Sequence, residues 1–207
     1  MIAIVDYGLG NVQAIANIYK RLNIPAVLAS TPAALESADR ILLPGVGSFD
    51  WAMQSLERAG LRTCLDKLVM QERRPVLGIC VGMQMMAKSS EEGQEAGLGW
   101  FDATVKRFDF KERAEPLMLP HMGWNDVTAS RTSPLLTGLE QDARFYFLHS
   151  YYFAPANQDD VIASADYGGA FACGVQSGKC YGVQFHPEKS HGWGVQLLKN
   201  FAEATAC

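Results

Sequence analysis

The residue best suited to covalent chemistry is Cys80, at the centre of the segment Gly78-Ile79-Cys80-Val81-Gly82. The apolar residues before it predict a strand, and the residues after it predict a helix. A cysteine in such a tight turn has a strained backbone, and the start of the helix favours the thiolate and directs N–H groups toward an oxyanion. The flanking glycines let neighbouring segments approach closely. The pattern indicates a nucleophile; the alternative is a buried structural cysteine, since cysteine is common in protein cores.

A base and an orienting carboxylate are found in His186-Pro187-Glu188, directly after the apolar run Tyr181–Phe185. Because Pro187 disfavours helix at the preceding residue, His186 is expected in extended geometry. Residues i and i+2 of an extended chain lie on the same side, which predicts the Glu188 carboxylate beside the imidazole of His186. Together with Cys80 these residues have the composition of a catalytic triad. For the three residues alone, a solvated turn is the alternative interpretation.

Elements that could position these residues alternate over the first ninety residues. Short apolar strands separated by helices are typical of a parallel sheet covered on both faces. Cys80 and the His-Pro-Glu segment then lie at or just beyond strand ends, where α/β sheets place their sites. Pro44-Gly45-Val46-Gly47 also follows a strand, and its glycines permit a peptide flip that could supply a second oxyanion donor. Strands are predicted at residues 2–5, 26–28, 40–43 and 75–79, and helices at residues 12–22, from 32 onward, and at 50–59, 61–72 and 81–88.

From Phe101 onward the pattern changes to strand-like segments with Gly, Asn and Asp in the turns. The chain has no internal repeat, no low-complexity segment and no linker that would separate domains. We therefore expect residues 1–207 to form a single mixed α/β domain. Strands are predicted at residues 104–108, 124–128, 144–153, 161–165, 171–176 and 181–185, and an amphipathic helix at about residues 194–204.

Composition excludes several classes of partner. Eighteen Lys and Arg residues against 22 Asp and Glu residues give a net charge of −4 without a basic block, so nucleic acid is not expected. No apolar stretch is long enough to span a membrane, and the N-terminus lacks a signal-peptide pattern. No Cys/His cluster suggests a metal, and no cofactor is expected. The odd, scattered cysteines predict a reduced, cytoplasmic protein, in which Cys64, Cys173, Cys180 and Cys207 have no special role.

Six segments carry more extended patterns: Asp6-Tyr7-Gly8-Leu9-Gly10-Asn11, Leu43-Pro44-Gly45-Val46-Gly47-Ser48-Phe49, Gly78-Ile79-Cys80-Val81-Gly82-Met83-Gln84, Pro120-His121-Met122-Gly123-Trp124-Asn125, Phe147-Leu148-His149-Ser150-Tyr151 and Gly182-Val183-Gln184-Phe185-His186-Pro187-Glu188-Lys189-Ser190. They resemble the class I, triad-type glutamine amidotransferases, in particular the glutaminase subunits of imidazole glycerol phosphate synthase. The resemblance covers essentially the whole chain. It implies the class I amidotransferase fold, a central and mostly parallel sheet flanked by helices with additional antiparallel strands.

The resemblance also implies a reaction. The thiolate of Cys80 would attack the side-chain carboxamide of L-glutamine, while His186 transfers protons and Glu188 holds the imidazole ring. The oxyanion would be met by the N–H of Val81 and, after a rearrangement, by a backbone N–H of the Val46 loop. The ammonia would pass to a (β/α)₈-barrel cyclase subunit of a heterodimer, which makes imidazole glycerol phosphate and aminoimidazole-carboxamide ribotide in histidine biosynthesis.

Further residues match positions of known use in that family. The positions that match glutamine-binding residues are Gly45, Gln84, Glu92, His149, Ser150 and Tyr151, and those that match residues facing the barrel are Trp124, Tyr146 and Lys189. Gln84 lies one helical turn beyond Cys80, so it can reach the same pocket. Without the family match, the three residues at barrel-facing positions have simpler interpretations: Trp124 and Tyr146 as core residues, and Lys189 as a solvated charge.

Three other functions remain open from the sequence. The chain could be the glutaminase of another synthase, such as that of pyridoxal phosphate synthesis, although the segments at 44–47 and 121–125 argue against it. It could be a redox sensor with Cys80 as an oxidisable thiol, but a sensor has no need of His186 and Glu188. A cysteine hydrolase acting alone would be fully active without a partner.

Overall fold

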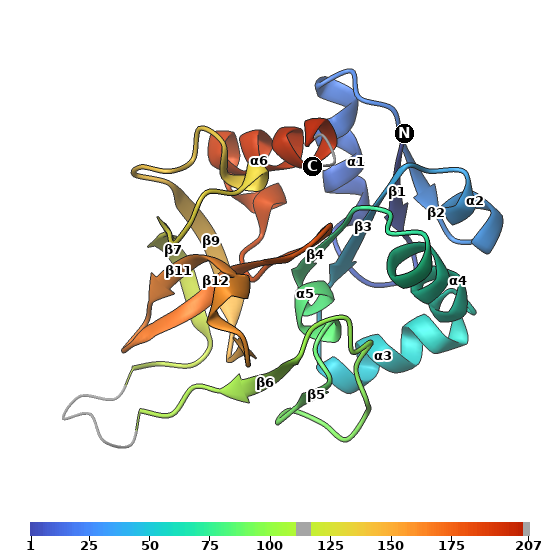
Figure 1. Ribbon diagram of the computed structural model, residues 1–207. Coiled ribbons are helices and arrows are strands. Elements are labelled where there is room, and N and C mark those ends of the chain that lie inside the picture. The colour runs from blue at the N-terminus through green and yellow to red at the C-terminus, as the bar shows by residue number, and fades with distance from the viewer. Residues whose placement is uncertain (111–116, 205–207) are drawn as a thin grey trace.

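The computed structural model describes residues 1–110 and 117–204, and the first part of the chain alternates between strands and helices (Figure 1). The strands in this part are largely apolar and most of their side chains fill the core, as the sequence predicts. Thr31 caps its helix by accepting a hydrogen bond from the N–H of Ala34, with Pro32 in the first turn. The elements are β1 (Ile2–Val5), α1 (Val12–Arg21), β2 (Ala26–Ala29), α2 (Pro32–Glu36), β3 (Arg40–Gly45), α3 (Phe49–Arg58), α4 (Arg62–Asp66), a π-helical segment (Lys67–Gln71), β4 (Val76–Cys80) and α5 (Val81–Met85).

The second part of the chain is built mainly of strands and ends in a long helix. That helix buries Leu197, Leu198 and Phe201 on its apolar side. The elements of this second part are β5 (Ser89–Ser90), β6 (Ala103–Arg107), β7 (His121–Asp126), β8 (Thr128–Ala129), β9 (Arg144–His149), β10 (Tyr151–Pro155), β11 (Val161–Asp166), β12 (Ala170–Ser177), β13 (Cys180–Val183) and α6 (His191–Glu203), with 3₁₀ turns at Pro134–Leu136, Gln158–Asp160 and Pro187–Lys189.

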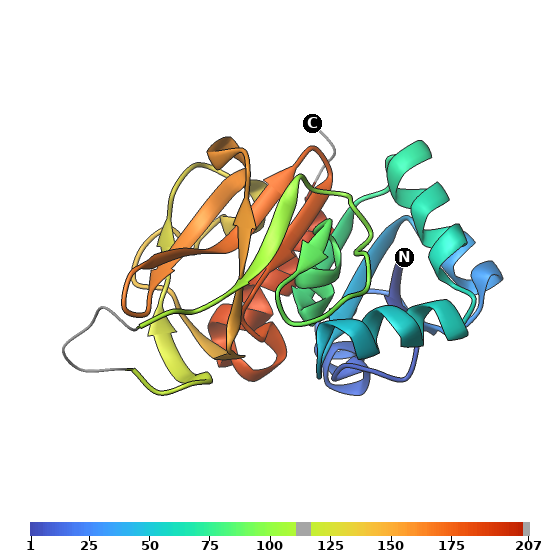
Figure 2. The ribbon, with the colours of Figure 1, turned by 90° about the horizontal axis from the view of Figure 1, so that it is seen from below.

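One large sheet joins the two parts of the chain. Its strand order is β2-β1-β3-β4-β13-β12-β10-β6-β5, with β11 paired to β12 and β8 to β11. The strands from β2 to β13 are parallel, whereas β13, β12, β10 and β6 pair antiparallel in turn. Helices α1 and α6 lie on one face of the parallel strands, and α3, α4 and α5 lie on the other (Figures 1 and 2). The predicted fold class, a mostly parallel sheet with helices on both faces and additional antiparallel strands, is confirmed.

Strands β7 and β9 form a separate two-stranded antiparallel sheet. The sequence analysis predicts one continuous strand over residues 144–153, but the chain turns at Ser150 and divides into two strands that belong to different sheets. His149 pairs with His121 in the small sheet, and Tyr151 pairs with Arg107 in the large one. Local periodicity reports only which residues are buried, so it does not reveal such a change of partner.

Two predicted helices also end differently. The helix expected over residues 81–88 stops at Met85, because the Met85 carbonyl accepts the N–H of Leu98 and the chain then enters β5. The helix expected over residues 61–72 exists, but its second half widens into the π-helical segment Lys67–Gln71. Within the described parts of the chain, no helix is long and apolar enough to cross a membrane.

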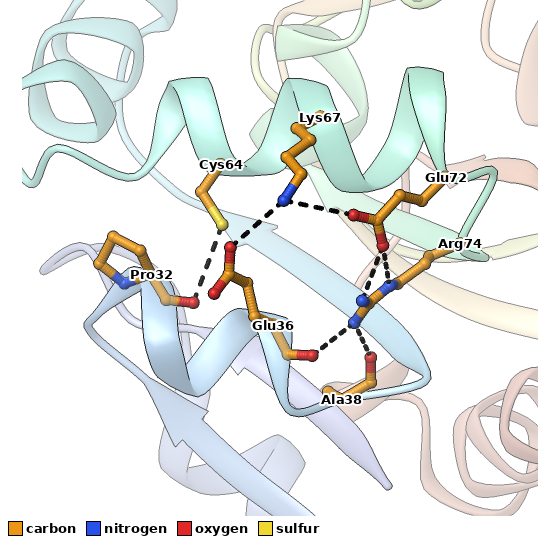
Figure 3. Close-up of polar contacts among 7 residues, drawn as sticks. All are labelled: Pro32, Glu36, Ala38, Cys64, Lys67, Glu72 and Arg74. Atoms are coloured by element: carbon orange, nitrogen blue, oxygen red, sulfur yellow. Dashed lines mark hydrogen bonds and ion pairs between the residues drawn. The ribbon is translucent and has the colours of Figure 1, made fainter.

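Polar side chains link α2, the π-helical segment and the residues between that segment and β4 at the edge of the molecule (Figure 3). Lys67 lies between the carboxylates of Glu36 and Glu72, at 3.6 and 3.5 Å, and the Arg74 guanidinium contacts Glu72 at 2.7 Å. Arg74 also donates to the carbonyls of Glu36 and Ala38, at 2.8 and 2.5 Å. Because these side chains are largely or partly exposed, the ion pairs stabilise the fold only slightly.

Candidate active site

Cys80 is the last residue of β4 and immediately precedes α5. Its backbone has φ 54° and ψ −115°, in a region that residues with a side chain rarely occupy. The surrounding strands hold it there, since β4 lies between the parallel strands β3 and β13. The predicted strained turn between strand and helix is therefore present, and the cysteine is its central residue.

Three glycines allow the close packing that this turn requires. A Cβ on Gly82 would overlap the carbonyl oxygen of Leu43 in β3. A Cβ on Gly45 would overlap the backbone N of Gly82, and one on Gly78 would lie 2.6 Å from the sulfur of Met86. The glycine on each side of Cys80 is thus explained by backbone contacts with β3 and α5.

Gly82→Ala is expected to lower the free energy of unfolding by roughly 3 kcal/mol, because Leu43 belongs to a central strand and cannot move aside. Urea unfolding of the purified protein measures this difference. Gly192→Ala is the matched control, since nothing lies within 4 Å of the added Cβ at the start of α6 and φ is not positive there. Equal stabilities of the two variants would contradict the packing argument.

The side chains of His186 and Glu188 form a buried pair, with 2.9 Å between Nδ1 and Oε1. Burial lowers the pKa of His186, but hydrogen bonds with Cys80 and Glu188 raise it by more, to about 10. Burial raises the pKa of Glu188, and the hydrogen bonds from His186 and Asn11 outweigh this and lower it. With Nδ1 directed to Glu188, the Nε2 side of the ring is available to the sulfur of Cys80.

Asn11 is a fourth member of this group that the sequence analysis does not single out. Its Nδ2 donates to Oε1 of Glu188 at 2.6 Å, so one carboxylate oxygen receives both Asn11 and His186. The second oxygen, Oε2, is buried and has no hydrogen-bond partner among the residues that the structure describes. The two donors on Oε1 therefore determine how the carboxylate is oriented against the imidazole.

The prediction that His186 and Glu188 are neighbours is confirmed in its result but not in its reason. His186 is extended, with φ −102° and ψ 96°, but Pro187–Lys189 is a 3₁₀ turn, so the alternation of an extended chain does not place Glu188. The imidazole is instead fixed through its backbone. The N–H of His186 donates to the Tyr146 carbonyl at 2.9 Å, and the Ser190 hydroxyl donates to the His186 carbonyl at 2.6 Å.

A cavity of about 350 Å³ opens in front of Cys80 and His186. The residues that line it include most of those expected to contact glutamine, which come from α5, the loop after β5 and the β9–β10 corner. Gly45 and Glu188 do not line it but lie directly behind it, against Gly82 and His186. The lining residues are Asn11, Val46, Gly47, Cys80, Val81, Gln84, Glu92, Pro120, Leu148, His149, Ser150, Tyr151, His186 and Lys189.

Gln84 and Glu92 are held by specific contacts. The Nε2 group of Gln84 donates to the Tyr151 carbonyl at 3.1 Å and to Oε1 of Gln184 at 3.0 Å. Both amide hydrogens are therefore used inside the protein, and the remaining polar atom of this cavity-lining side chain is the acceptor Oε1. Glu92 accepts the N–H of Phe49 at 2.8 Å, which places a carboxylate at the start of α3, where the helix favours negative charge.

Trp124, Tyr146 and Lys189 lie together beside this cavity. Trp124 pairs with Tyr146 across the β7–β9 sheet, and the Lys189 ammonium is 5.6 Å from the centre of the Tyr146 ring. The outer face of the sheet continues with Met122 opposite Leu148, and 65% and 37% of these side chains are exposed. Trp124 is 41% exposed, so the simpler interpretation of it as a core residue is wrong. We call Met122, Trp124, Tyr146 and Leu148 the outer apolar face.

The other described cysteines do not have the surroundings of a nucleophile. Burial raises the pKa of the Cys173 thiol, and it raises that of Cys180 to about 11. Burial and then the nearby Glu36 carboxylate raise the pKa of Cys64, which contacts the Pro32 carbonyl (Figure 3). Cys207 lies outside the described residues. Within those residues, no group of three or more His, Cys, Asp or Glu side chains could hold a metal ion.

His149 is buried beside the cavity and contacts a second histidine, His121. Burial lowers the pKa of His149 to about 3, although its hydrogen bond to Tyr151 acts in the opposite direction. Burial also lowers the pKa of His121, to about 4. Both imidazoles are therefore neutral at physiological pH.

This neutral state makes folding sensitive to acid. Below pH 6.5 the unfolded chain binds a proton at His149 and the folded chain does not. The contribution of the neutral His149 to the free energy of unfolding is therefore fully present above pH 6.5 and is lost as the pH falls toward 3. The difference in free energy of unfolding between wild type and His149→Asn is expected to shrink by about 1.4 kcal/mol for each pH unit below 6. Urea titrations at pH 7, 6 and 5 measure it. A difference independent of pH would contradict a buried neutral imidazole.

Sequence reasoning does not identify several residues that contact the triad and the cavity-lining side chains. Asn11, Ser190 and His121 all lie in the six patterned segments, but nothing in their local spacing shows which side chain they contact. Gln184 is fully buried, and its Nε2 lies 3.8 Å from the sulfur of Cys80. A polar residue inside an otherwise apolar strand run was the available signal for Gln184.

Comparison with known proteins agrees with this geometry. The family model Glutamine amidotransferase class-I matches residues 3–204. A protein of Bdellovibrio bacteriovorus named Imidazole glycerol phosphate synthase subunit HisH is 57% identical over 203 residues, 98% of this chain and 100% of the relative. A relative of the same name from Leptospira interrogans is 52% identical over 202 residues, 98% of this chain and 99% of the relative.

Solved structures show the same fold at lower identity. A glutamine amidotransferase crystal structure aligns with a TM-score of 0.74 at 21% identity and covers 98% of both chains. A putative GMP synthase protein from Thermoplasma acidophilum aligns with a TM-score of 0.72 at 20% identity, over 97% of this chain and 91% of that one. With the family model and the two relatives, the conclusion is that the chain belongs to the class I glutamine amidotransferase family and, within it, to the family of imidazole glycerol phosphate synthase subunits HisH.

Proposed function

We propose that the protein is the glutaminase subunit of imidazole glycerol phosphate synthase and that Cys80, His186 and Glu188 are its catalytic residues. The observation that carries the proposal is the strained cysteine at the end of β4, beside an imidazole that a buried carboxylate holds, at the wall of a cavity. The name shared by the relatives with 57% and 52% identity favours this function over another synthase or a redox sensor.

In the first half of the reaction, the sulfur of Cys80 attacks the side-chain carbonyl carbon of glutamine, and the C=O electron pair moves onto the oxygen. When the tetrahedral intermediate collapses, the C–N bond breaks and the Nε2 proton of His186 passes to the departing nitrogen. Ammonia leaves, and a thioester with Cys80 remains. Glu188 keeps Nδ1 protonated, which holds the ring in the tautomer that this transfer requires.

In the second half, the neutral His186 removes a proton from water, whose oxygen attacks the thioester carbon. Collapse of this intermediate breaks the C–S bond, releases glutamate and returns Cys80 and the protonated His186 to their starting state. Val81 begins α5, so its N–H has no partner within the helix, which supports the proposal that it stabilises both oxyanions. A second N–H from Val46, after rearrangement of the loop beside Gly47, stays a prediction.

The cavity fits a small polar substrate such as glutamine. It has a thiol at one wall, an amide acceptor in Gln84, a carboxylate in Glu92 and the backbone of the His149–Tyr151 corner. Gly45 contributes by the absence of a side chain, since a Cβ there would overlap α5. These residues are proposed to bind the amino-acid part of glutamine and direct its carboxamide toward Cys80.

The ammonia is proposed to enter a (β/α)₈-barrel cyclase subunit that docks on the outer apolar face. An exposed apolar surface of this kind, next to an active-site cavity, is typical of an interface. Lys189 lines the cavity and lies over Tyr146, so it connects the cavity to that face. The described cysteines are free thiols, which supports the further proposal that this heterodimer is cytoplasmic.

An assay of glutamate release tests the function. Purified protein is measured alone, with the cyclase, and with both the cyclase and its nucleotide substrate. The expected result is slow hydrolysis alone and fast hydrolysis with both additions, accompanied by formation of imidazole glycerol phosphate. Full activity without the cyclase would indicate a hydrolase that acts alone, and no hydrolysis under any condition would overturn the proposal.

Met122→Asp is expected to weaken binding of the cyclase by roughly tenfold or more, because the carboxylate would be buried in the interface. Titration calorimetry measures the affinity. The matched control is Met70→Asp, since Met70 is 44% exposed in the π-helical segment, before β4 rather than at its catalytic end. Equal affinities of the two variants would place the interface elsewhere.

A further inference from the structure

A chain of hydrogen bonds runs from the edge of the β7–β9 sheet to the wall of the cavity. Asn125 lies 3.3 Å from Nε2 of His121, and Nδ1 of His121 lies 3.0 Å from Nε2 of His149. Nδ1 of His149 lies 2.8 Å from the carbonyl oxygen of Tyr151. His121 and His149 pair across the sheet and are 4% and 6% exposed, so water is largely excluded from these hydrogen bonds.

The contacts determine which nitrogen of each ring carries the proton. A carbonyl oxygen can only accept, so Nδ1 of His149 donates to Tyr151. The ring is neutral, hence its Nε2 is an acceptor and receives the Nδ1 proton of His121. Nε2 of His121 then accepts from Asn125, whose amide orientation is fixed because its oxygen accepts the N–H of Asp126 at 2.9 Å. Every donor in this series of hydrogen bonds therefore points toward the cavity.

This series of hydrogen bonds ends at groups proposed to bind and convert glutamine. The Tyr151 carbonyl accepts from both His149 and Gln84. The amide of Gln84 reaches Gln184, and the amide of Gln184 reaches the sulfur of Cys80. A rotation of the Tyr151 carbonyl would release the Gln84 amide, which could then turn and present N–H groups in place of its acceptor oxygen.

We propose that His121 is a positioning residue for the glutamine cavity: its Nδ1–H is donated to Nε2 of His149 and so holds the His149 ring, the Tyr151 carbonyl and the Gln84 amide in place. This inference rests on the proposed glutaminase function. Without the His121 donor, Nε2 of His149 is a buried acceptor that has lost its partner, which costs free energy as long as the ring stays in place. A ring that turns toward another donor moves its Nδ1–H away from the Tyr151 carbonyl, and the corner at residues 149–151 would shift with it.

Two substitutions separate this role from simple packing. The ring of His121 stacks between Phe147 and Tyr167, at centroid distances of 4.8 and 4.0 Å. His121→Phe keeps an aromatic ring there but removes the donor, whereas His121→Asn loses the ring but keeps an N–H close to the position of Nδ1. A packing role predicts that Phe is tolerated and Asn is not; the positioning role predicts the reverse.

The kinetic test uses the complex with the cyclase in the presence of its nucleotide substrate. His121→Phe is expected to raise KM for glutamine roughly fivefold at nearly constant kcat, as the loss of a hydrogen bond of about 1 kcal/mol predicts. His121→Asn is expected to restore KM. Synthesis from ammonium salts is expected to be equal in all three proteins, because it does not use this cavity. An unchanged KM in His121→Phe, or an equal loss in both variants, would overturn the proposal.

Nuclear magnetic resonance of protein labelled with ¹⁵N-histidine gives a readout that does not depend on activity. The expected spectra show His121 and His149 neutral and protonated on Nδ1 in the wild type, and the Nε2 resonance of His149 shifted in His121→Phe by the loss of its hydrogen bond. A proton on Nε2 of His149 in the wild type, or unchanged His149 resonances in His121→Phe, would overturn the positioning role. Failure of the glutaminase assay alone would instead count against the proposed function, because the tautomers are measured without it.

Discussion

Cys80→Ala is expected to abolish glutamine-dependent activity while leaving synthesis from ammonium salts by the assembled complex unchanged. The variant lacks the sulfur that forms the thioester, and loss of a nucleophile from a triad costs roughly 10⁴-fold or more in turnover. The cyclase reaction itself needs only ammonia, so an external supply bypasses the missing step. The two activities are measured on one preparation, as glutamate release and as product formation with an ammonium salt.

The control for this experiment is Cys180→Ala. Burial raises the pKa of Cys180 to about 11, and its side chain does not line the cavity. It is expected to retain both activities. Loss of both activities in Cys80→Ala would indicate a damaged fold rather than a missing nucleophile, and retained glutamine hydrolysis would exclude Cys80 from the chemistry.

His186→Ala is the second large effect that the site predicts. The imidazole protonates ammonia and later activates water, and no other described titratable side chain is hydrogen-bonded to it except Cys80 and Glu188. Turnover is expected to fall by roughly 10⁴-fold or more. Glu188→Gln keeps the imidazole and removes only its charged partner, so the loss is expected to be roughly a hundredfold smaller.

Steady-state kinetics of the complex compare the two variants. The midpoint of thermal unfolding is measured on the same samples, because Glu188 is buried and accepts from both His186 and Asn11. If Glu188→Gln, still folded, were as damaging as His186→Ala, the carboxylate would have a role beyond orientation of the ring. A nearly active His186→Ala would remove it from the proton transfers.

Local sequence patterns were sufficient where a function depends on neighbours in the chain. The strained turn at Cys80 was predicted from a strand, a helix and two glycines, and the structure shows that the glycines accommodate Leu43 and Met86. The alternation of strands and helices over the first ninety residues was predicted in the same way. Such features follow from hydrophobic periodicity and from the space that a missing Cβ leaves.

Features that depend on distant contacts could not be predicted from local patterns. The division of residues 144–153 between two sheets depends on pairing with His121 on one side and Arg107 on the other. The contact of Asn11 with Glu188 joins residues from opposite ends of the chain. The positions that resemble glutamine-binding residues were identified by family resemblance, and their side-chain partners became visible only in the folded chain.

Covalent labelling tests the central claim, that Cys80 is a nucleophile which attacks glutamine in this cavity, most directly. The complex is treated with a glutamine analogue that carries an electrophilic carbon in place of the carboxamide, and the modified peptide is identified by mass spectrometry. The account predicts one adduct, on Cys80, that forms much more slowly in His186→Ala and is prevented by excess glutamine. Labelling of another cysteine, or labelling that persists undiminished in Cys80→Ala, would contradict it.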